Sequence, residues 1–304
     1  MDSLNTKNNF IAIIGVPNVG KSSLINSLMG QKISIVSSKP QTTRTRILGI
    51  LTKEETQLVF IDTPGIHTPK TQLGKYMEKS IMSSVTSVDT AILVVDASKK
   101  ISEDETKLIE KVKLLNIPLI LAINKIDLIQ DKTKLFEIIS SMSKLHNFHA
   151  IIPISAKKFD GLNLLVEELI KLSTDGVHFF DDDALTDQPE KVLVSEIIRE
   201  KMLRLLDKEI PHGVAVSIEK MRERENKPLI DIIATIYCEK ENHKRIIIGK
   251  NGSMLKKIGS QARHDIELFL DSKINLNIWV KVKENWKNRI SLLKNFGYDS
   301  NNLK

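Results

Sequence analysis

Short apolar runs alternate with segments of helical period along the first half of the chain. Runs of this length with polar flanks indicate buried strands, and apolar residues recurring every three or four positions indicate helices. The expected strands are residues 10–14, 47–51, 57–61, 90–96, 118–123 and 150–154, and the expected helices are 23–29, 71–87, 102–115, 133–145 and 161–172. This alternation predicts a mostly parallel sheet, with the short polar turn at 52–55 making one strand antiparallel.

The pattern changes after an acidic stretch without an apolar period, at residues 176–190. Beyond it we expect a smaller α+β unit with charged residues 221–227 between its first two strands, and a closing helix over 284–296 in which Ile290 and Leu293 pack as core. Its expected elements are helix 192–206, strands 214–219 and 229–237, a short helix leading to residues 246–252, helix 253–270 and strand 276–282. The predicted domains are therefore 1–175 and 191–304, joined by a linker at 176–190.

Charge separates the two halves more clearly than composition does. The chain has 304 residues, enough for about two domains, and a net charge of +7, while residues 191–304 alone hold 23 Lys+Arg against 15 Asp+Glu. The second half thus carries the whole positive excess, which favours nucleic acid or an anionic membrane as its partner.

Cysteine usage and hydropathy indicate the compartment. The single cysteine, Cys238, excludes an internal disulfide framework and fits a reducing environment. The N-terminus lacks a signal-peptide pattern, and no apolar run approaches the ~20 residues that span a bilayer. We expect a cytoplasmic protein whose contact with a membrane, if any, is peripheral.

Residues 15–22 have the sequence GVPNVGKS, which fits the phosphate-binding pattern G-x-x-x-x-G-K-[ST]. Glycines let successive backbone N–H groups converge on phosphates, and the following helix presents its positive end to the same anion. Lys21 would contact the β- and γ-phosphates, and the Ser22 hydroxyl would bind magnesium. The expected strand before the loop and helix after it favour this interpretation over an ordinary glycine turn.

Two further motifs lie where a γ-phosphate and its metal ion would be contacted. The polar segment 37–46 is expected to be a mobile loop whose threonine reaches magnesium and the γ-phosphate, and we favour Thr43 over Thr42. The strand ending at residue 61 runs into DTPG, where Asp62 would assist the metal and Gly65 would bring its N–H close to the γ-phosphate.

Residues 124–127, NKID, distinguish guanine from adenine. The carboxylate of Asp127 can accept hydrogen bonds from the ring N–H and exocyclic amine of guanine, a donor pair that adenine lacks. Asn124 would tie the surrounding loops together, with the lysine stem over the base. Residues 155–157, SAK, follow the next strand, and the Ala156 N–H could reach the guanine carbonyl. These residues disfavour an ATP-dependent enzyme.

These motifs, in this order and spacing, resemble the translation-factor-like branch of small GTPases and specifically the Era family. The resemblance covers the first half and implies Mg²⁺-dependent hydrolysis of GTP to GDP with a slow intrinsic rate. Ile66 stands where Ras-like proteins carry a water-orienting glutamine, and its presence agrees with this branch. Some relatives use K⁺ beside the phosphates, so Asn18 implies a K⁺ contact.

The expected site residues fall into three sets. Lys21, Thr43 and Gly65 are the expected catalytic residues, and Ser22, Thr43 and Asp62 the expected metal site. The nucleotide is expected to be bound by Gly15, Pro17, Asn18, Val19, Gly20, Lys21, Ser22, Ser23, Asp62, Thr63, Pro64, Gly65, Asn124, Lys125, Asp127, Ser155, Ala156 and Lys157.

A second glycine motif, GKNG at residues 249–252, separates two expected helices in the basic half. Such a loop can grip a single-stranded nucleic-acid backbone while an adjacent apolar groove receives bases, although G-x-x-G alone also occurs in ordinary helix connections. Basic neighbours strengthen the first interpretation. The expected RNA contacts are Ile248, Gly249, Lys250, Asn251, Gly252, Lys256 and Arg263.

The element order of the second half resembles the KH fold of prokaryotic topology, which also forms the C-terminal domain of Era proteins. The resemblance implies binding to the 3′ end of 16S ribosomal RNA and to the 30S subunit, a role in small-subunit maturation, peripheral contact with the inner membrane, and a monomeric state. The main alternative is a peripheral membrane or scaffold protein whose basic half binds anionic lipid. The predicted fold class is a Ras-like P-loop GTPase domain followed by a KH-type α+β domain.

Overall fold

The computed structural model describes residues 6–37, 39, 42–44, 46–62, 71–77, 79, 88–114, 116–225 and 227–298. Its contacts divide the chain into two compact units. The first comprises Met1–Ser34, Thr43–His67 and Glu78–Asp187, and the second Ile35–Thr42, Thr68–Met77 and Gln188–Lys304. Two short segments of the N-terminal half therefore belong by their contacts to the second unit.

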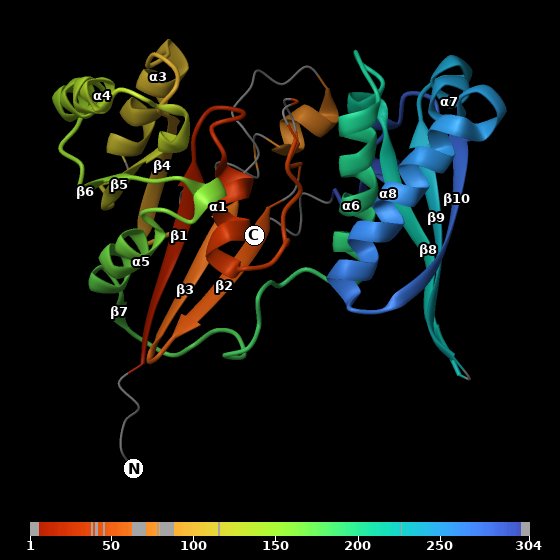
Figure 1. The fold of residues 1–304 in the computed structure, drawn as a ribbon, viewed down its shortest axis with the longest axis horizontal. Coiled ribbons are helices and arrows are strands. Elements are labelled where there is room, and N and C mark those ends of the chain that lie inside the picture. Colours follow the sequence, from red (N-terminus) through yellow and green to blue (C-terminus); the bar gives the residue numbers. More distant parts are fainter. Residues whose placement is uncertain are drawn as a thin grey trace. The chain divides into compact units, whose positions relative to one another are not determined.

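The first unit contains a mostly parallel sheet (Figure 1). Its strands are β1 (Lys7–Ile14), β2 (Ile47–Lys53), β3 (Thr56–Asp62), β4 (Thr90–Asp96), β5 (Leu119–Asn124), β6 (Ala150–Pro153) and β7 (Thr174–Asp175). Six of them follow the order β2-β3-β1-β4-β5-β6, and β7 pairs with β1. The β2–β3 hairpin and the β1–β7 pair are antiparallel and the other pairs are parallel. The mixed sheet expected from the hydropathy pattern is confirmed.

Alternate residues of the central strands enter two separate cores. On β1, Ile11 and Ile13 pack on the face covered by α1 and α5, whereas Ala12 and Ile14 pack on the face covered by α3 and α4. Strands buried on both faces read as continuous apolar runs, which explains the pattern. The helices are α1 (Lys21–Met29), α3 (Glu103–Lys113), α4 (Lys132–Leu145) and α5 (Leu162–Lys171), with 3₁₀ turns at Ile126–Leu128 and Ala156–Lys158. Residues 72–77 are also helical, whereas residues 78 and 80–87 of the expected helix lie outside the described residues.

The acidic stretch after α5 returns to the first sheet. The backbone N–H groups of Phe179 and Phe180 donate to Gln57 Oε1 at 2.8 and 3.1 Å, and the N–H of Ile50 donates to the Leu185 carbonyl at 3.0 Å. Residues 174–187 therefore belong to the first unit, although their sequence has no apolar period. These hydrogen bonds, together with isolated contacts of Phe179 with Phe10 and of Phe180 with the sheet, leave no hydrophobic period in the sequence.

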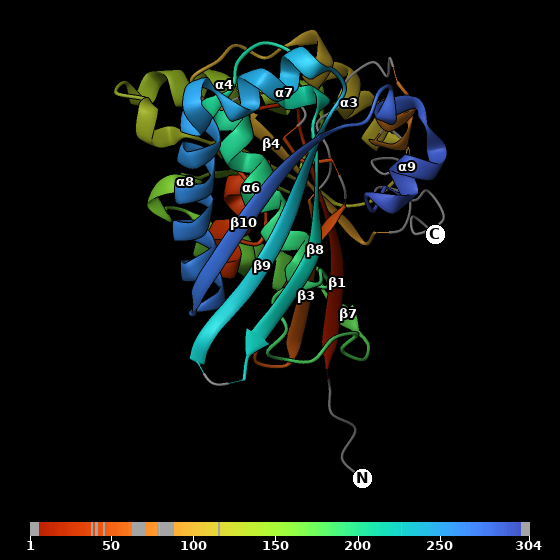
Figure 2. The same ribbon diagram turned by 90° about the vertical axis from the view of Figure 1, so that its right-hand side faces the viewer.

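The second unit packs three helices against a three-stranded sheet (Figure 2). Its elements are α6 (Glu190–Leu205), β8 (Ala215–Arg224), β9 (Lys227–Cys238), α7 (Glu241–Ile248), α8 (Ser253–Leu270) and β10 (Lys273–Val282), with 3₁₀ turns at Pro211–Gly213 and Lys250–Gly252. The strand order is β10-β9-β8, with β9 antiparallel to β8 and parallel to β10. Apolar side chains from α6, α7, α8 and the strands form its core.

The charged stretch 221–227 was expected to separate two strands, and this expectation is largely wrong. The β8–β9 hairpin continues to the pair Arg224 and Lys227. Arg224 donates to both carboxylate oxygens of Asp231 at 2.7 Å across the hairpin. Cross-strand ion pairs let charged residues occupy an exposed ladder.

The closing segment forms a 3₁₀ turn at Trp286–Asn288 and a short helix α9 at Ile290–Asn295, in place of one longer helix. Leu293 is buried as expected, but Ile290 is 63% exposed, so its assignment to the core is wrong. Trp286 is fully buried and its indole N–H donates to the Gly213 carbonyl at 3.0 Å. No helix among the described residues has both the length and the apolar character required to cross a bilayer.

Candidate nucleotide and nucleic-acid sites

The phosphate-binding pattern forms a tight loop between β1 and α1 that requires its glycines. Gly15 and Gly20 have φ angles of 153° and 105°. A Cβ on Gly15 would lie 2.5 Å from the Val94 carbonyl oxygen, and one on Gly20 would lie 2.2 Å from Asn124 Nδ2. Neither position has room for a side chain. Glycine at both positions lets the loop backbone pack closely against β4 and β5 near their C-terminal ends.

Lys21 lies across this loop. Its ammonium group donates to the carbonyls of Gly15 at 2.8 Å and Val16 at 3.0 Å. Burial lowers the pKa of Lys21 from 10.5 to about 8, although the nearby Asp62 carboxylate acts in the opposite direction. Burial disfavours the charged form of this ammonium group. A bound phosphate would stabilise the charged form and so offset the cost of burial.

Oxygen ligands gather next to Lys21. Asp62 Oδ2 accepts hydrogen bonds from Ser22 Oγ at 2.9 Å and Ser34 Oγ at 2.8 Å, and Thr43 Oγ1 lies 3.0 Å from Ser22 Oγ and 3.4 Å from Asp62 Oδ2. By contrast, the Thr42 hydroxyl donates to the Lys39 carbonyl at 2.6 Å. The geometry thus brings together Ser22, Thr43 and Asp62, the three residues expected at a metal site.

Asp62 shows that this cluster fits a cation. Its side chain is fully buried, and Oδ1 has no hydrogen-bond partner among the described residues. Burial raises the pKa of Asp62, against the influence of Lys21 and the three hydroxyl groups. A buried carboxylate oxygen without a donor, beside two hydroxyl groups, matches the oxygen ligands that Mg²⁺ prefers.

Asn124, at the end of β5, connects three loops. Its Nδ2 donates to the Val19 carbonyl at 2.9 Å, and its Oδ1 accepts from the N–H groups of Ala156 at 3.0 Å and Lys125 at 2.8 Å. The side chain is buried. One amide thereby fixes the phosphate loop, the NKID segment and the SAK segment together. The Ala156 N–H is engaged by this bond, so a contact with a guanine carbonyl would have to share it.

The Lys125 side chain is held by an acidic residue that sequence analysis missed. Its ammonium group donates to Asp96 Oδ2 at 2.6 Å and to the Asn18 carbonyl at 2.7 Å. Burial acts to raise the pKa of Asp96, but hydrogen bonds from Lys125 and Ser98 hold it below its ordinary value. The available signal was an aspartate at the C-terminal end of a buried strand.

Asp127 is exposed, and its Oδ1 accepts a hydrogen bond from Ser155 Oγ at 2.6 Å. The buried Ser155 also accepts from the Lys158 N–H at 3.2 Å, so it links Asp127 to the SAK segment. The carboxylate is held at the surface next to the loop that Asn124 anchors. Of the remaining expected nucleotide residues, Thr63, Pro64 and Gly65 lie outside the described residues, as does Ile66.

The second glycine motif forms a left-handed loop between α7 and α8. Gly249, Asn251 and Gly252 have φ angles of 74°, 52° and 76°. A Cβ on Gly249 would lie 2.8 Å from the Met254 Cβ, whereas a Cβ on Gly252 would meet no atom within 4 Å. Gly249 is therefore required by packing and conformation, while Gly252 leaves its backbone open to an approaching ligand.

A groove of about 390 Å³ begins at this loop. It is lined by Gly252, Leu255, Lys256, Gly259, Ser260, Arg263, Asn275, Leu276 and Ile278. Of the expected RNA contacts, Gly252, Lys256 and Arg263 line it, whereas Ile248, Gly249, Lys250 and Asn251 do not. The additional lining residues share one face of α8 at intervals of three or four positions, or lie on β10, and this helical period was the signal for them.

The groove combines chemistry suited to a nucleic-acid strand. Leu255, Leu276 and Ile278 offer apolar surface for bases, and Lys256 and Arg263 place positive charge on α8. Arg263 is half exposed and its guanidinium donates to Glu267 Oε1 at 3.2 Å, which orients it. Single-stranded RNA is recognised by such a combination of apolar contacts and backbone charge.

Fold and site define a class: a P-loop GTPase domain of Ras-like topology followed by a KH domain. Family models agree, since residues 10–125 match "50S ribosome-binding GTPase" and residues 209–287 match "KH domain". The chain is 52% identical to GTPase Era of Ruminiclostridium cellulolyticum over 98% of this chain and 99% of that protein. It is 50% identical to GTPase Era of Clostridioides difficile over 96% and 99%. The chain belongs to the Era family of GTPases.

Two solved structures share the whole architecture. Aquifex aeolicus Era, as a variant bound to GDP·AlF4⁻, superposes with a TM-score of 0.92 at 38% identity, over 96% of this chain and 99% of that one. Era in complex with MgGDPNP and nucleotides 1506–1542 of 16S ribosomal RNA gives the same values. The family, the fold class and the GTPase activity expected from the sequence are thus confirmed.

Proposed function

We propose that this GTPase is a nucleotide-dependent switch that binds the 3′ end of 16S ribosomal RNA and assists assembly of the small ribosomal subunit. In this proposal residues 1–175 bind the nucleotide, 176–190 connect, and 191–304 bind RNA. The observation that carries the proposal is the coexistence of an Asn124-centred nucleotide site with a basic, apolar-lined groove at the GKNG loop. An Era structure holding both MgGDPNP and this RNA supports it.

The expected nucleotide residues then have distinct tasks. The phosphate loop and Lys21 bind the phosphates, Ser22, Thr43 and Asp62 hold Mg²⁺, and Asp127 reads the guanine edge. Bound Mg²⁺ would neutralise charge on the β- and γ-phosphates. Lys21 stabilises charge that develops as water attacks the γ-phosphate in line, and Gly65 supplies a backbone N–H to the same group.

Guanine recognition is tested by Asp127→Asn. Replacing two charge-assisted hydrogen bonds by at most one neutral one should weaken GTP binding by about 100-fold. Preference should shift toward xanthosine nucleotides, in which an accepting carbonyl replaces the exocyclic amine and can pair with the asparagine NH2. Asp131→Asn is a matched control, because Asp131 caps α4 through the Thr133 N–H at 2.9 Å and asparagine caps equally well. Unchanged GTP affinity in Asp127→Asn, measured by titration calorimetry, would contradict the assignment.

RNA recognition is tested by Gly252→Asp, because the new carboxylate would face the phosphate path. We expect loss of binding to a 16S rRNA 3′-end oligonucleotide with nucleotide affinity unchanged. Gly297→Asp is the matched control, since Gly297 also has a positive φ of 84° and open space around its Cβ position. Equal RNA affinity of the two variants at moderate salt would count against the groove. Liposome sedimentation in parallel distinguishes RNA from the alternative partner, an anionic membrane.

The remaining assignments are also proposals. A cytoplasmic monomer is expected, with peripheral contact to the inner membrane. K⁺ would bind beside the phosphates near Asn18, whose left-handed backbone (φ 68°) directs its carbonyl to Lys125. Faster GTP hydrolysis in KCl than in NaCl is the expected result, and equal rates would remove the K⁺ site.

A further inference from the structure

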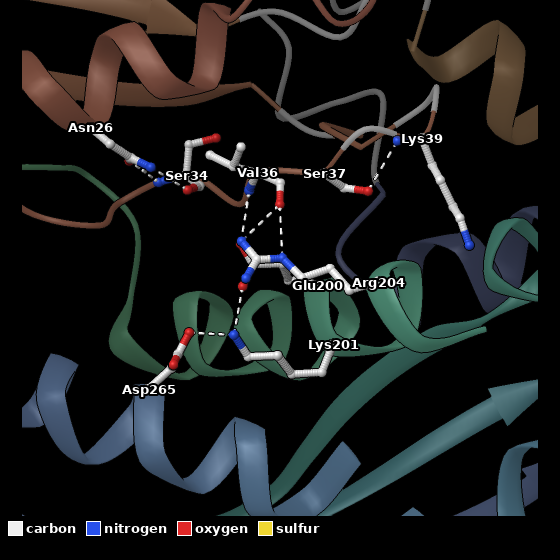
Figure 3. A network of polar contacts seen from close by, with 9 residues as sticks. All are labelled: Asn26, Ser34, Val36, Ser37, Lys39, Glu200, Lys201, Arg204 and Asp265. Carbon is white, nitrogen blue, oxygen red and sulfur yellow. Dashed lines mark hydrogen bonds and ion pairs between the residues drawn. The ribbon is translucent and has the colours of Figure 1, made fainter. Parts of the chain in front are cut away.

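The segment that leads into Thr43 is held by charged side chains of α6. Residues 35–42 belong by their contacts to the second unit. Figure 3 shows Val36 beside Glu200 and Arg204, with Lys201 extending to Asp265. On the N-terminal side, Ser34 is fixed in the first unit, because its N–H and carbonyl bond to the Asn26 amide at 2.8 and 2.7 Å and its hydroxyl bonds to Asp62.

Both backbone groups of Val36 are bound by one acid–base pair. The Val36 N–H donates to Glu200 Oε1 at 3.0 Å, and Arg204 NH2 donates to the Val36 carbonyl at 3.1 Å. Arg204 NH2 also lies 2.9 Å from Glu200 Oε1. A charged donor and a charged acceptor therefore bind both backbone groups of one residue, Val36. Two charge-assisted hydrogen bonds restrict the segment more than one would.

Two further contacts hold the segment closer to Thr43. Lys39 donates to the Leu206 carbonyl just beyond α6 and lies 3.3 Å from Asp207. Arg199 donates to the Thr42 carbonyl, one peptide bond before Thr43. These contacts with α6 and its C-terminal end therefore reach the residue directly before Thr43, whose own hydroxyl lies beside Ser22 and Asp62.

The same network continues to the helix that lines the RNA groove. Lys201 bonds to Glu200 Oε2 at 2.9 Å and to Asp265 on α8. Asp265 lies on α8, the same helix that carries the groove residues Lys256 and Arg263. The side chains of Glu200 and Lys201 are 0% and 3% exposed. An adjustment of α8 that moves Asp265 would therefore be transmitted to Glu200 and from there to Val36.

Stability alone does not account for this arrangement. Buried ion pairs contribute little net stability, because removing charges from water costs about as much as their attraction returns. Yet Arg199, Glu200 and Arg204 all bind the backbone of one segment, which an apolar contact would hold without fixing its peptide orientation. Fixing that orientation is what an ordered γ-phosphate loop requires.

We propose that Glu200 and Arg204 are positioning residues for the nucleotide site. They hold Val36 so that Thr43 is placed for the triphosphate state, and the Lys201–Asp265 ion pair makes that hold respond to RNA in the groove. The inference rests on the proposed function, since it assigns the regulation of the same two sites. By thermodynamic linkage, RNA that strengthens the hold tightens GTP binding, and GTP tightens RNA binding by the same factor.

The test uses the full-length protein and compares GDP with a non-hydrolysable GTP analogue, GDPNP. Thr43 contacts the γ-phosphate only in the triphosphate complex, so Arg204→Met should weaken GDPNP binding by about tenfold while GDP affinity stays unchanged. Arg204→Lys should restore part of the loss. Arg224→Met is the matched control, because the Arg224 side chain is 42% exposed against 48% for Arg204 and pairs with Asp231 in the same unit.

A second arm measures how a saturating 16S rRNA 3′-end oligonucleotide changes GDPNP affinity. The wild-type protein should show a change that Asp265→Asn abolishes. Equal losses of GDP and GDPNP affinity in Arg204→Met, or no loss of either, would overturn the positioning role. An RNA effect retained in Asp265→Asn would overturn the link to α8. Failure of wild-type protein to bind GDPNP or RNA would instead refute the proposed function.

Discussion

Replacing Asn124 with alanine should release two loops of the nucleotide site at once. The change removes three buried hydrogen bonds, to the Val19 carbonyl and from the N–H groups of Lys125 and Ala156. At about 1 kcal/mol net for each bond, the loops lose about 3 kcal/mol of local stability. Because 1.4 kcal/mol corresponds to a factor of ten, opening should become about 100-fold more frequent.

Hydrogen–deuterium exchange measures this opening directly, because Lys125 and Ala156 are the amides that donate to the missing oxygen. Exchange at both should accelerate by about 100-fold without nucleotide. Asn124→Asp keeps the acceptor oxygens but loses the donor to Val19, so Lys125 and Ala156 should stay protected while peptides from the phosphate loop exchange faster. Asn147→Ala, at an exposed position, controls for loss of an asparagine.

Exchange rates in Asn124→Ala within about twofold of wild type at both amides would refute this reasoning. Such a result would mean that the loops hold their positions without the asparagine, through other contacts of β5 and β6. The phosphate loop and the NKID and SAK segments would then be held together by contacts other than the Asn124 side chain.

Two other predictions follow from charges at the nucleotide site. The pKa of Lys21 is lowered to about 8, so in the free protein this side chain is partly deprotonated at pH 8.5. Bound phosphates keep it charged, so GDP binding should take up a fraction of a proton at that pH. The affinity for GDP should accordingly fall as pH rises from 7 to 8.5, and Lys21→Arg should bind GDP without proton uptake. Calorimetry in buffers of different ionisation enthalpy measures this uptake. Absence of proton uptake in the wild-type protein would contradict the prediction. Asp96→Asn keeps the contacts to Ser98 but removes the ion pair with Lys125 at 2.6 Å. Because Lys125 is expected to lie over the guanine base that GDP and GTP share, both affinities should fall together by about tenfold. A loss of affinity for only one of the two nucleotides would contradict this explanation.

Much of the first unit could be predicted because its signals are local. Continuous apolar runs marked β1, β3, β4 and β5, and parallel strands bring their C-terminal ends to one sheet edge. Motifs at the ends of those strands therefore had to meet, as Asn124 and Ala156 do. Ser102 followed by Glu105 forms a capping box at the start of α3, another local signal.

Contacts between residues distant in sequence were beyond such reasoning. Gln57 binds the backbone of residues 179 and 180, and Arg204 binds that of Val36, through hydrogen bonds with no periodicity. Charged residues 221–227 looked like a loop because their partners lie across the hairpin. Ile290 matched a helical period, but α9 begins at that residue and leaves its side chain in solvent. In each case the deciding partner is far along the chain.

The central claim is that nucleotide state controls RNA binding in this protein. The most direct measurement is the dissociation constant for a 16S rRNA 3′-end oligonucleotide, determined by fluorescence anisotropy with saturating GDP and again with saturating GDPNP. The account predicts tighter binding with GDPNP, and a ratio close to one in Arg204→Met. Equal affinities of the wild-type protein in the two states, or no RNA binding in either, would contradict it.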